Sequence, residues 1–117
     1  MSYIESDGPL TDIQSLCHLC YQNAKEKGFH EYTPTLGKHG QDARHILSWL
    51  MLITTEVAEA AEAVRKGDKE NFGEELADVC IRIFDTAEAL GVNLQRHILE
   101  KMSKNRQREV RHGGKLA

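Results

Sequence analysis

The sequence predicts an all-α protein of four helices, whose bundle core is completed by oligomerisation. Three observations predict this class. Apolar residues recur at spacings of three and four along most of the chain, the pattern of a helix face, and there is almost no strand signal. Glycines follow the first three periodic segments, where they favour helix ends. The 117 residues are expected to form one domain, 1–117, near the size at which a second copy adds much of the stability.

The first periodic segment predicts a helix over residues 10–27. Its apolar positions are Leu10, Ile13, Cys17, Cys20 and Ala24. Gly28 is the expected C-cap. Residues 28–41 contain Pro34 and many polar residues, and predict a loop that is long for a small helical domain. Loops of this length often carry function.

Three further helices follow the loop. They are expected over residues 42–66, 68–90 and 93–108, with an irregular tail over residues 109–117. Asp42 is the expected N-cap of the first of these, because an aspartate side chain can accept hydrogen bonds from a first helical turn. Gly67 and Gly91 are expected to end the first two.

Two of these helices carry more apolar surface than a monomer needs. On the helix over residues 68–90, Ile81 and Phe84 lie outside the main apolar stripe. On the helix over residues 42–66, a second apolar line passes through Trp49 and Leu52. A monomeric bundle usually exposes polar residues on the face opposite its core. We therefore expect a homodimer or homotetramer, with part of this surface lining a substrate pocket.

Composition excludes several classes of function. Fifteen basic and eighteen acidic residues give a formal charge of −3, which offers no surface for duplex nucleic acid. No segment reads as a signal peptide, and the longest nearly apolar run, residues 46–53, is too short to span a membrane. The three cysteines suit reduced thiols, with those of the first helix facing the core. A cytoplasmic protein without a membrane partner is expected.

Two acidic pairs are the most informative feature of the chain. Glu56 and Glu59 lie three residues apart on one expected helix, and Glu75 and Asp78 lie three apart on the next. Residues at this spacing project from nearly the same helix face. Two unit charges about 4 Å apart repel by roughly 4 kcal/mol at a protein-like dielectric, so four facing acids favour a bound cation. Oxygen ligands alone favour Mg²⁺, with Mn²⁺ possible.

An alternative is that these acids form a solvated helix face. That interpretation is preferred for the other helix acids, which are Glu62, Glu70, Glu74, Asp85 and Glu88. Arg82 lies four residues after Asp78 and could pair with it. Metal binding gains support from the last helix, where Lys101, Asn105 and Arg108 recur on one face. These side chains are suited to holding phosphate oxygens.

Three segments together resemble the MazG-type all-α nucleoside triphosphate pyrophosphohydrolases. They are residues 55–63 (TEVAEAAEA), 74–79 (EELADV) and 101–106 (KMSKNR). The resemblance extends over about residues 27–115 and is greatest to small single-domain MazG-like proteins, which share the KGF junction at residues 27–29 and the RHGGK tail at residues 111–115. The segment over residues 93–108 is also similar to dCTP pyrophosphatases.

The resemblance implies roles for individual residues. Glu56, Glu59, Glu75 and Asp78 would bind Mg²⁺, and Lys101 and Asn105, with Arg108, would contact phosphates. Many members have a further Glu where this chain has Thr55, which leaves the number of metal ions open.

Phe29, His30 and Trp49 are candidates for a base pocket. The strong average burial of tryptophan favours a core or pocket-wall position for Trp49.

The expected reaction is Mg²⁺-dependent hydrolysis of a (deoxy)nucleoside triphosphate to the monophosphate and pyrophosphate, in house-cleaning of the nucleotide pool. Glu59 or Glu56 would accept the proton of the attacking water, and the sequence leaves both open. Two alternatives remain: a non-catalytic metal-binding module that regulates an oligomer, and a phosphoribosyl-ATP pyrophosphohydrolase. A di-iron bundle is disfavoured because neither acidic pair is a Glu-x-x-His motif.

Overall fold

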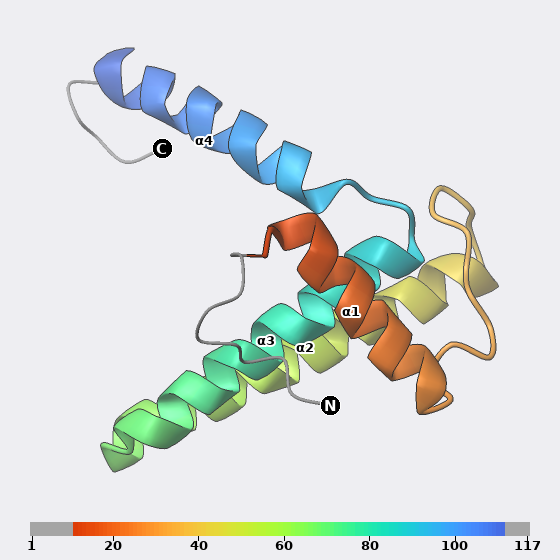
Figure 1. Ribbon diagram of the computed structural model, residues 1–117, viewed down its shortest axis with the longest axis horizontal. Coiled ribbons are helices and arrows are strands. Elements are labelled where there is room, and N and C mark those ends of the chain that lie inside the picture. The colour runs from red at the N-terminus through yellow and green to blue at the C-terminus, as the bar shows by residue number, and fades with distance from the viewer. Residues whose placement is uncertain (1–10, 112–117) are drawn as a thin grey trace.

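Four helices and their connections form the computed structural model, which describes residues 11–111 (Figure 1). The helices are α1 (Ile13–Glu26), α2 (Gln41–Lys66), α3 (Lys69–Ala89) and α4 (Leu94–Arg111). No strand occurs within residues 11–111, so the predicted all-α class is confirmed. None of the four helices is both long enough and apolar enough to cross a membrane.

Side-chain caps determine where two of the helices begin. The Asp12 carboxylate accepts a hydrogen bond of 2.7 Å from the backbone N–H of Ser15, so α1 begins at Ile13 and not at residue 10 as expected. Asp68 caps α3 in the same way through the N–H of Asn71, at 3.1 Å. This cap agrees with the predicted start of the third helix.

The predicted N-cap of α2 was wrong. Gly40 is the N-cap, and its positive φ of 72° explains why a glycine occupies this position. Asp42 lies in the first turn, where its carboxylate accepts hydrogen bonds from the Tyr32 hydroxyl and from the Thr35 backbone N–H. These bonds lower the pKa of Asp42, the largest cause being the bond from Tyr32. Asp42 therefore fastens the preceding loop to α2.

Helix α4 is longer than expected. It continues through Arg111, so the first three residues of the predicted irregular tail are helical. The remainder of that tail, residues 112–117, and Leu10 at the other end lie outside the described residues.

The α2–α3 hairpin is the central unit of the fold. The two helices lie side by side, and α1 packs across α3 (Figure 1). Beyond its first turns, α4 points away from this unit (Figure 1).

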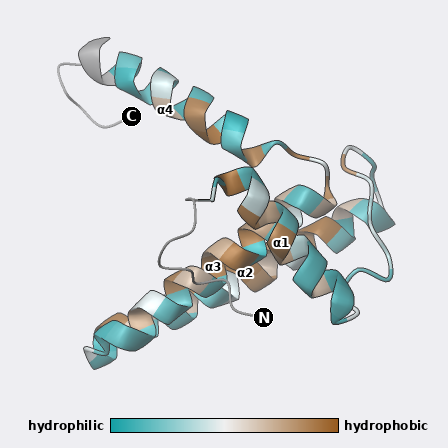
Figure 2. Ribbon diagram, viewed as in Figure 1, coloured by the Kyte–Doolittle hydropathy of each residue, from teal (hydrophilic) through white to brown (hydrophobic). Residues whose placement is uncertain are grey.

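The core is thin for a chain of this length. Within residues 11–108, the buried residues are Cys17, Pro34, Ala60, Ala63 and Ala87. Large apolar side chains are exposed on all four helices. Those on the α2–α3 hairpin include Leu47, Leu50, Met51, Leu52, Val57, Val64, Leu76 and Ile81. Figure 2 shows hydrophobic and hydrophilic residues mixed along each helix.

Candidate functional site

The hairpin brings three of the four predicted acids to one point. One carboxylate oxygen each from Glu56, Glu75 and Asp78 lies within 4.8 Å of the other two. These three side chains are called the acid cluster below. Glu59 is not one of the three, but its side chain forms a hydrogen bond with Glu75. Two consecutive helices thus place the carboxylates of Glu56, Glu59 and Asp78 around that of Glu75.

Glu75 is at the centre of this arrangement electrostatically. Burial raises the pKa of its carboxyl, and the hydrogen bond to Glu59 and the negative charges of Glu59, Asp78 and Glu56 raise it further. The Glu75 Oε2 atom is buried and has no hydrogen-bond partner among the described residues. An oxygen buried without a donor, next to two other carboxylates, suits a hard divalent cation.

Arg82 partly balances this negative charge, but not through the contact with Asp78 that was left open as an alternative. Its Nε donates a hydrogen bond of 3.1 Å to Glu56 Oε1 on the neighbouring helix, and it forms no ion pair with Asp78 on its own helix. The Glu56 side chain is only 14 % exposed, whereas that of Arg82 is 43 % exposed. Asp78, the third member of the acid cluster, is exposed. The structure therefore does not contain the alternative ion pair between Asp78 and Arg82.

The raised pKa of Glu75 predicts how stability changes with pH. A carboxyl whose pKa is higher in the folded state stabilises that state most below its ordinary pKa of 4.5, and this contribution is lost as pH rises through the raised value. Mg²⁺ would remove the repulsion that then appears. The rise in Tm on adding Mg²⁺ should therefore be larger at about pH 8 than at about pH 5.

Thermal unfolding with and without Mg²⁺ across this pH range measures that effect. The variant Glu75→Gln, which lacks the carboxyl at the centre of the acid cluster, is the control and should show almost no Mg²⁺-induced rise in Tm at either pH. An equal rise in the wild-type protein at both pH values would contradict the prediction.

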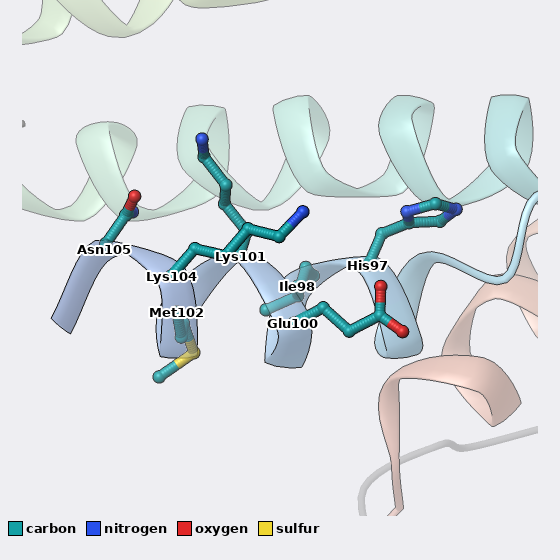
Figure 3. Close-up of a pocket in the computed structure, with 7 residues that line it drawn as sticks. All are labelled: His97, Ile98, Glu100, Lys101, Met102, Lys104 and Asn105. Carbon is teal, nitrogen blue, oxygen red and sulfur yellow. The ribbon is translucent and has the colours of Figure 1, made fainter. Parts of the chain in front are cut away.

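The predicted phosphate-binding residues do not lie at the acid cluster of the same chain. Lys101, Asn105 and Arg108 are exposed on α4. Figure 3 shows that the side chains of Lys101, Lys104 and Asn105 extend to one side of α4, at an open hollow lined by residues between His97 and Asn105. The face shared by Lys101 and Asn105 was predicted from their spacing, but the direction of α4 was not.

An aromatic cluster forms where the loop meets the start of α2. The His30 ring lies edge-on to Trp49, with 5.4 Å between centroids, and 4.9 Å from Tyr21. The His45 ring lies 5.3 Å from both Trp49 and Tyr32. Of the three predicted base-pocket residues, His30 and Trp49 are therefore in contact. The third, Phe29, is 65 % exposed and belongs to no ring contact in the described part of the chain.

Asp85 holds His30 in this cluster. A hydrogen bond of 2.6 Å joins His30 Nε2 to Asp85 Oδ1, and the His30 side chain is only 2 % exposed. Burial raises the pKa of Asp85, and the contact with His30 partly offsets that rise. The expectation that Asp85 lies on a solvated face was wrong. A sequence signal existed, because Asp85 follows Asp78 by seven residues and so falls on the same face of α3.

The acid cluster and the aromatic cluster lie along one face of the hairpin. Trp49 precedes Glu56 by seven residues on α2, as Asp78 precedes Asp85 on α3. Seven residues are two helical turns, or roughly 10 Å along the axis. That separation suits a ligand with an anionic end and a flat, ring-shaped end.

Fold and site together define an all-α protein with a candidate cation site formed by a helical hairpin. A family model, the MazG nucleotide pyrophosphohydrolase domain, matches residues 44–111, which is more than half of the chain. The chain therefore belongs to the MazG nucleotide pyrophosphohydrolase family. Membership supports a nucleotide pyrophosphohydrolase activity in general, in a family that generally depends on a divalent metal. No curated protein and no solved structure matches the chain.

The matched segment covers the acid cluster but only part of the aromatic cluster. Both acidic pairs, Trp49 and the whole of α4 lie inside it, whereas Phe29 and His30 lie before it. The match begins at Arg44, so the KGF junction at residues 27–29 lies outside it.

Proposed function

We propose that this protein hydrolyses a (deoxy)nucleoside triphosphate to the monophosphate and pyrophosphate, with Mg²⁺ as the cofactor and Mn²⁺ as a substitute. The observation that carries the proposal is the acid cluster, in which three carboxylates from two helices converge around a buried Glu75 oxygen that lacks a partner. This cluster lies inside the segment that matches the nucleotide pyrophosphohydrolase family.

Glu56, Glu75 and Asp78 would hold the metal, which would offset triphosphate charge and polarise the α-phosphoryl group. Among the four acids, Glu59 is the best candidate to accept the proton of the attacking water. It is exposed and lies next to the cluster without being one of its three members. Glu56 is less suited, because Arg82 occupies one of its oxygens. The choice left open by the sequence thus falls on Glu59.

The aromatic cluster would bind the base. Trp49 would offer ring surface roughly two helical turns from the acids. The buried His30 ring, which is hydrogen-bonded to Asp85, would support the Trp49 ring from behind. Phe29 is too exposed to be a wall of this pocket. Lys101 and Asn105, with Arg108, would bind the leaving pyrophosphate and stabilise its charge.

The exposed apolar surface of the hairpin supports a homodimer or homotetramer. A chain with only five buried residues within residues 11–108 gains stability by covering Met51 and the exposed leucines of α2 and α3. We assign the protein to house-cleaning of the cytoplasmic nucleotide pool.

A substrate panel tests the activity. Wild-type protein with Mg²⁺ should convert at least one of a set of standard and modified (deoxy)nucleoside triphosphates, or phosphoribosyl-ATP, to monophosphate and pyrophosphate. Glu62→Gln should leave the rate unchanged, because Glu62 pairs with Arg65 on the outer surface of α2. Release of orthophosphate would contradict the proposed reaction. Mg²⁺-dependent stabilisation without any turnover would favour the regulatory module instead.

A further inference from the structure

Arg82 is a cation beside the acid cluster that has no role in the reaction proposed above. Among the basic residues that the structure describes, it alone forms an ion pair with a member of this cluster. Lys101 and Arg108, which were predicted to bind phosphate, are exposed on α4, and α4 points away from the hairpin (Figure 1). Within one chain, Arg82 is therefore the described cation that a substrate at the acid cluster can reach.

One end of the Arg82 guanidinium is fixed and the other end is free. Its Nε donates a hydrogen bond of 3.1 Å to Glu56 Oε1 on α2. An arginine has five N–H donors, and those on Nη1 and Nη2 of Arg82 form no hydrogen bond with any residue within 11–111. Because 43 % of this side chain is exposed, these donors remain available to a ligand.

Arg82 lies between the acid cluster and the aromatic cluster along α3. It follows Asp78 by four residues and precedes Asp85 by three, so it is about one helical turn from each. Residues at these spacings lie on one helix face. Burial raises the pKa of Asp85, and the contact with His30 and the charge of Arg82 partly offset that rise. The charge of Arg82 therefore acts on both clusters.

This position corresponds to the middle of a bound nucleotide. With the metal-bound phosphates at the acid cluster and the base at Trp49, the phosphate next to the sugar would lie beside Arg82. A planar guanidinium can bind two oxygens of one phosphate through parallel hydrogen bonds. Because Glu56 already holds Nε, the side chain would lose little further freedom when a ligand binds.

We propose that Arg82 is a substrate-contacting residue, whose Nη1 and Nη2 groups bind the phosphate next to the sugar while Glu56 holds Nε. The inference rests on the proposed function for the identity of the ligand. During hydrolysis, the guanidinium would offset the charge that develops on the α-phosphoryl group as water attacks it. The same contact would make the site bind a nucleoside monophosphate more tightly than the nucleoside.

Binding of ligands with and without the phosphate tests this contact. NMR titrations of ¹⁵N-labelled protein with saturating Mg²⁺ use the standard deoxynucleoside 5′-monophosphates, the monophosphate product of any nucleotide that the protein hydrolyses, and the matching nucleosides. Wild-type protein should bind at least one monophosphate more tightly than its nucleoside. Arg82→Gln should weaken monophosphate binding by about 10- to 100-fold, as for lost hydrogen bonds to a charged group, and leave nucleoside binding unchanged.

Two further variants separate the phosphate contact from the support that Arg82 gives to Glu56. Arg82→Lys keeps a positive charge beside Glu56 but lacks the planar fork, so monophosphate binding should fall by a smaller factor. This variant also tests the contact if Arg82→Gln does not fold. Arg65→Gln removes an arginine that pairs with Glu62 on the outer surface of α2, and it should behave like wild type.

Mg²⁺ affinity, measured by calorimetry without nucleotide, distinguishes the contact from a purely positioning role. Arg82→Gln should bind Mg²⁺ at least as tightly as wild type, because the substitution removes a cation from the site. If Arg82 only oriented Glu56, Mg²⁺ affinity would fall while the ratio of monophosphate to nucleoside affinity stayed at the wild-type value. That result would overturn the proposal.

Turnover separates this inference from the proposed function. Pyrophosphate release by wild-type protein, with an unchanged affinity ratio in Arg82→Gln, would overturn the phosphate contact and leave the proposed function standing. Monophosphate binding that depends on Arg82 in a protein without hydrolase activity would support the contact and contradict the proposed function. A wild-type protein that binds none of the monophosphates would also overturn the contact.

Discussion

Replacing Glu75 with glutamine is expected to remove Mg²⁺ binding and to lower turnover by on the order of 100-fold or more. Glutamine keeps the size of the side chain and one oxygen, but it removes the negative charge at the centre of the cluster. Glu75 is the residue that Glu59, Asp78 and Glu56 all influence, and its Oε2 is the buried oxygen without a partner. No other acid of the cluster can take over this position.

Calorimetric titration with Mg²⁺ and pyrophosphate release measure the two effects, with Glu74→Gln as the control. Glu74 is the preceding residue on α3, it is exposed, and it lies outside the cluster. The metal-free Glu75→Gln protein should be at least as stable as wild type, because it loses carboxylate repulsion and a burial cost. Mg²⁺ binding by Glu75→Gln with unchanged affinity would show that the metal site lies elsewhere.

Local rules account for the helices that the sequence predicts well. Periodic apolar residues locate all four helices, and the left-handed φ of 69° at Gly67 explains why α2 ends there. The cap at Asp42 failed for a non-local reason. Its carboxylate is engaged by Tyr32 and Thr35 from the loop, so the N-cap position passes to Gly40. The helix-capping preference of aspartate depends on the residues next to it in sequence, so it cannot predict that the loop will engage this carboxylate instead.

Contacts between elements limit what could be predicted of the site. Spacing of three residues identifies Glu75 and Asp78 as a pair, but it cannot show that Arg82 reaches across to Glu56. The contact between His30 and Asp85 joins residues 55 positions apart, so the periodicity of a single helix cannot predict it. Similarly, the face shared by the α4 side chains follows from helical spacing, whereas the direction of α4 depends on the hydrogen bonds of Gln95 with α1.

Replacing Glu59 with glutamine is expected to separate catalysis from metal binding. A general base typically contributes about 100- to 10,000-fold to a rate, so turnover should fall by that order while a folded oligomer remains. Mg²⁺ affinity should change little, because Glu59 is not among the three acids whose oxygens converge. Loss of the Glu59 carboxyl also removes one of the charges that raise the pKa of Glu75, so metal binding should extend to slightly lower pH.

Single-turnover measurements with saturating Mg²⁺, together with calorimetric Mg²⁺ titration, test both halves of this prediction. Glu62→Gln, one helical turn further along α2 and paired with Arg65, is the matched control and should behave like wild type in both assays. If Glu59 were a fourth metal ligand, as the family resemblance implies, Mg²⁺ affinity would fall together with turnover, and excess Mg²⁺ would restore part of the rate. A rate that stays at the wild-type level would exclude Glu59 as the proton acceptor.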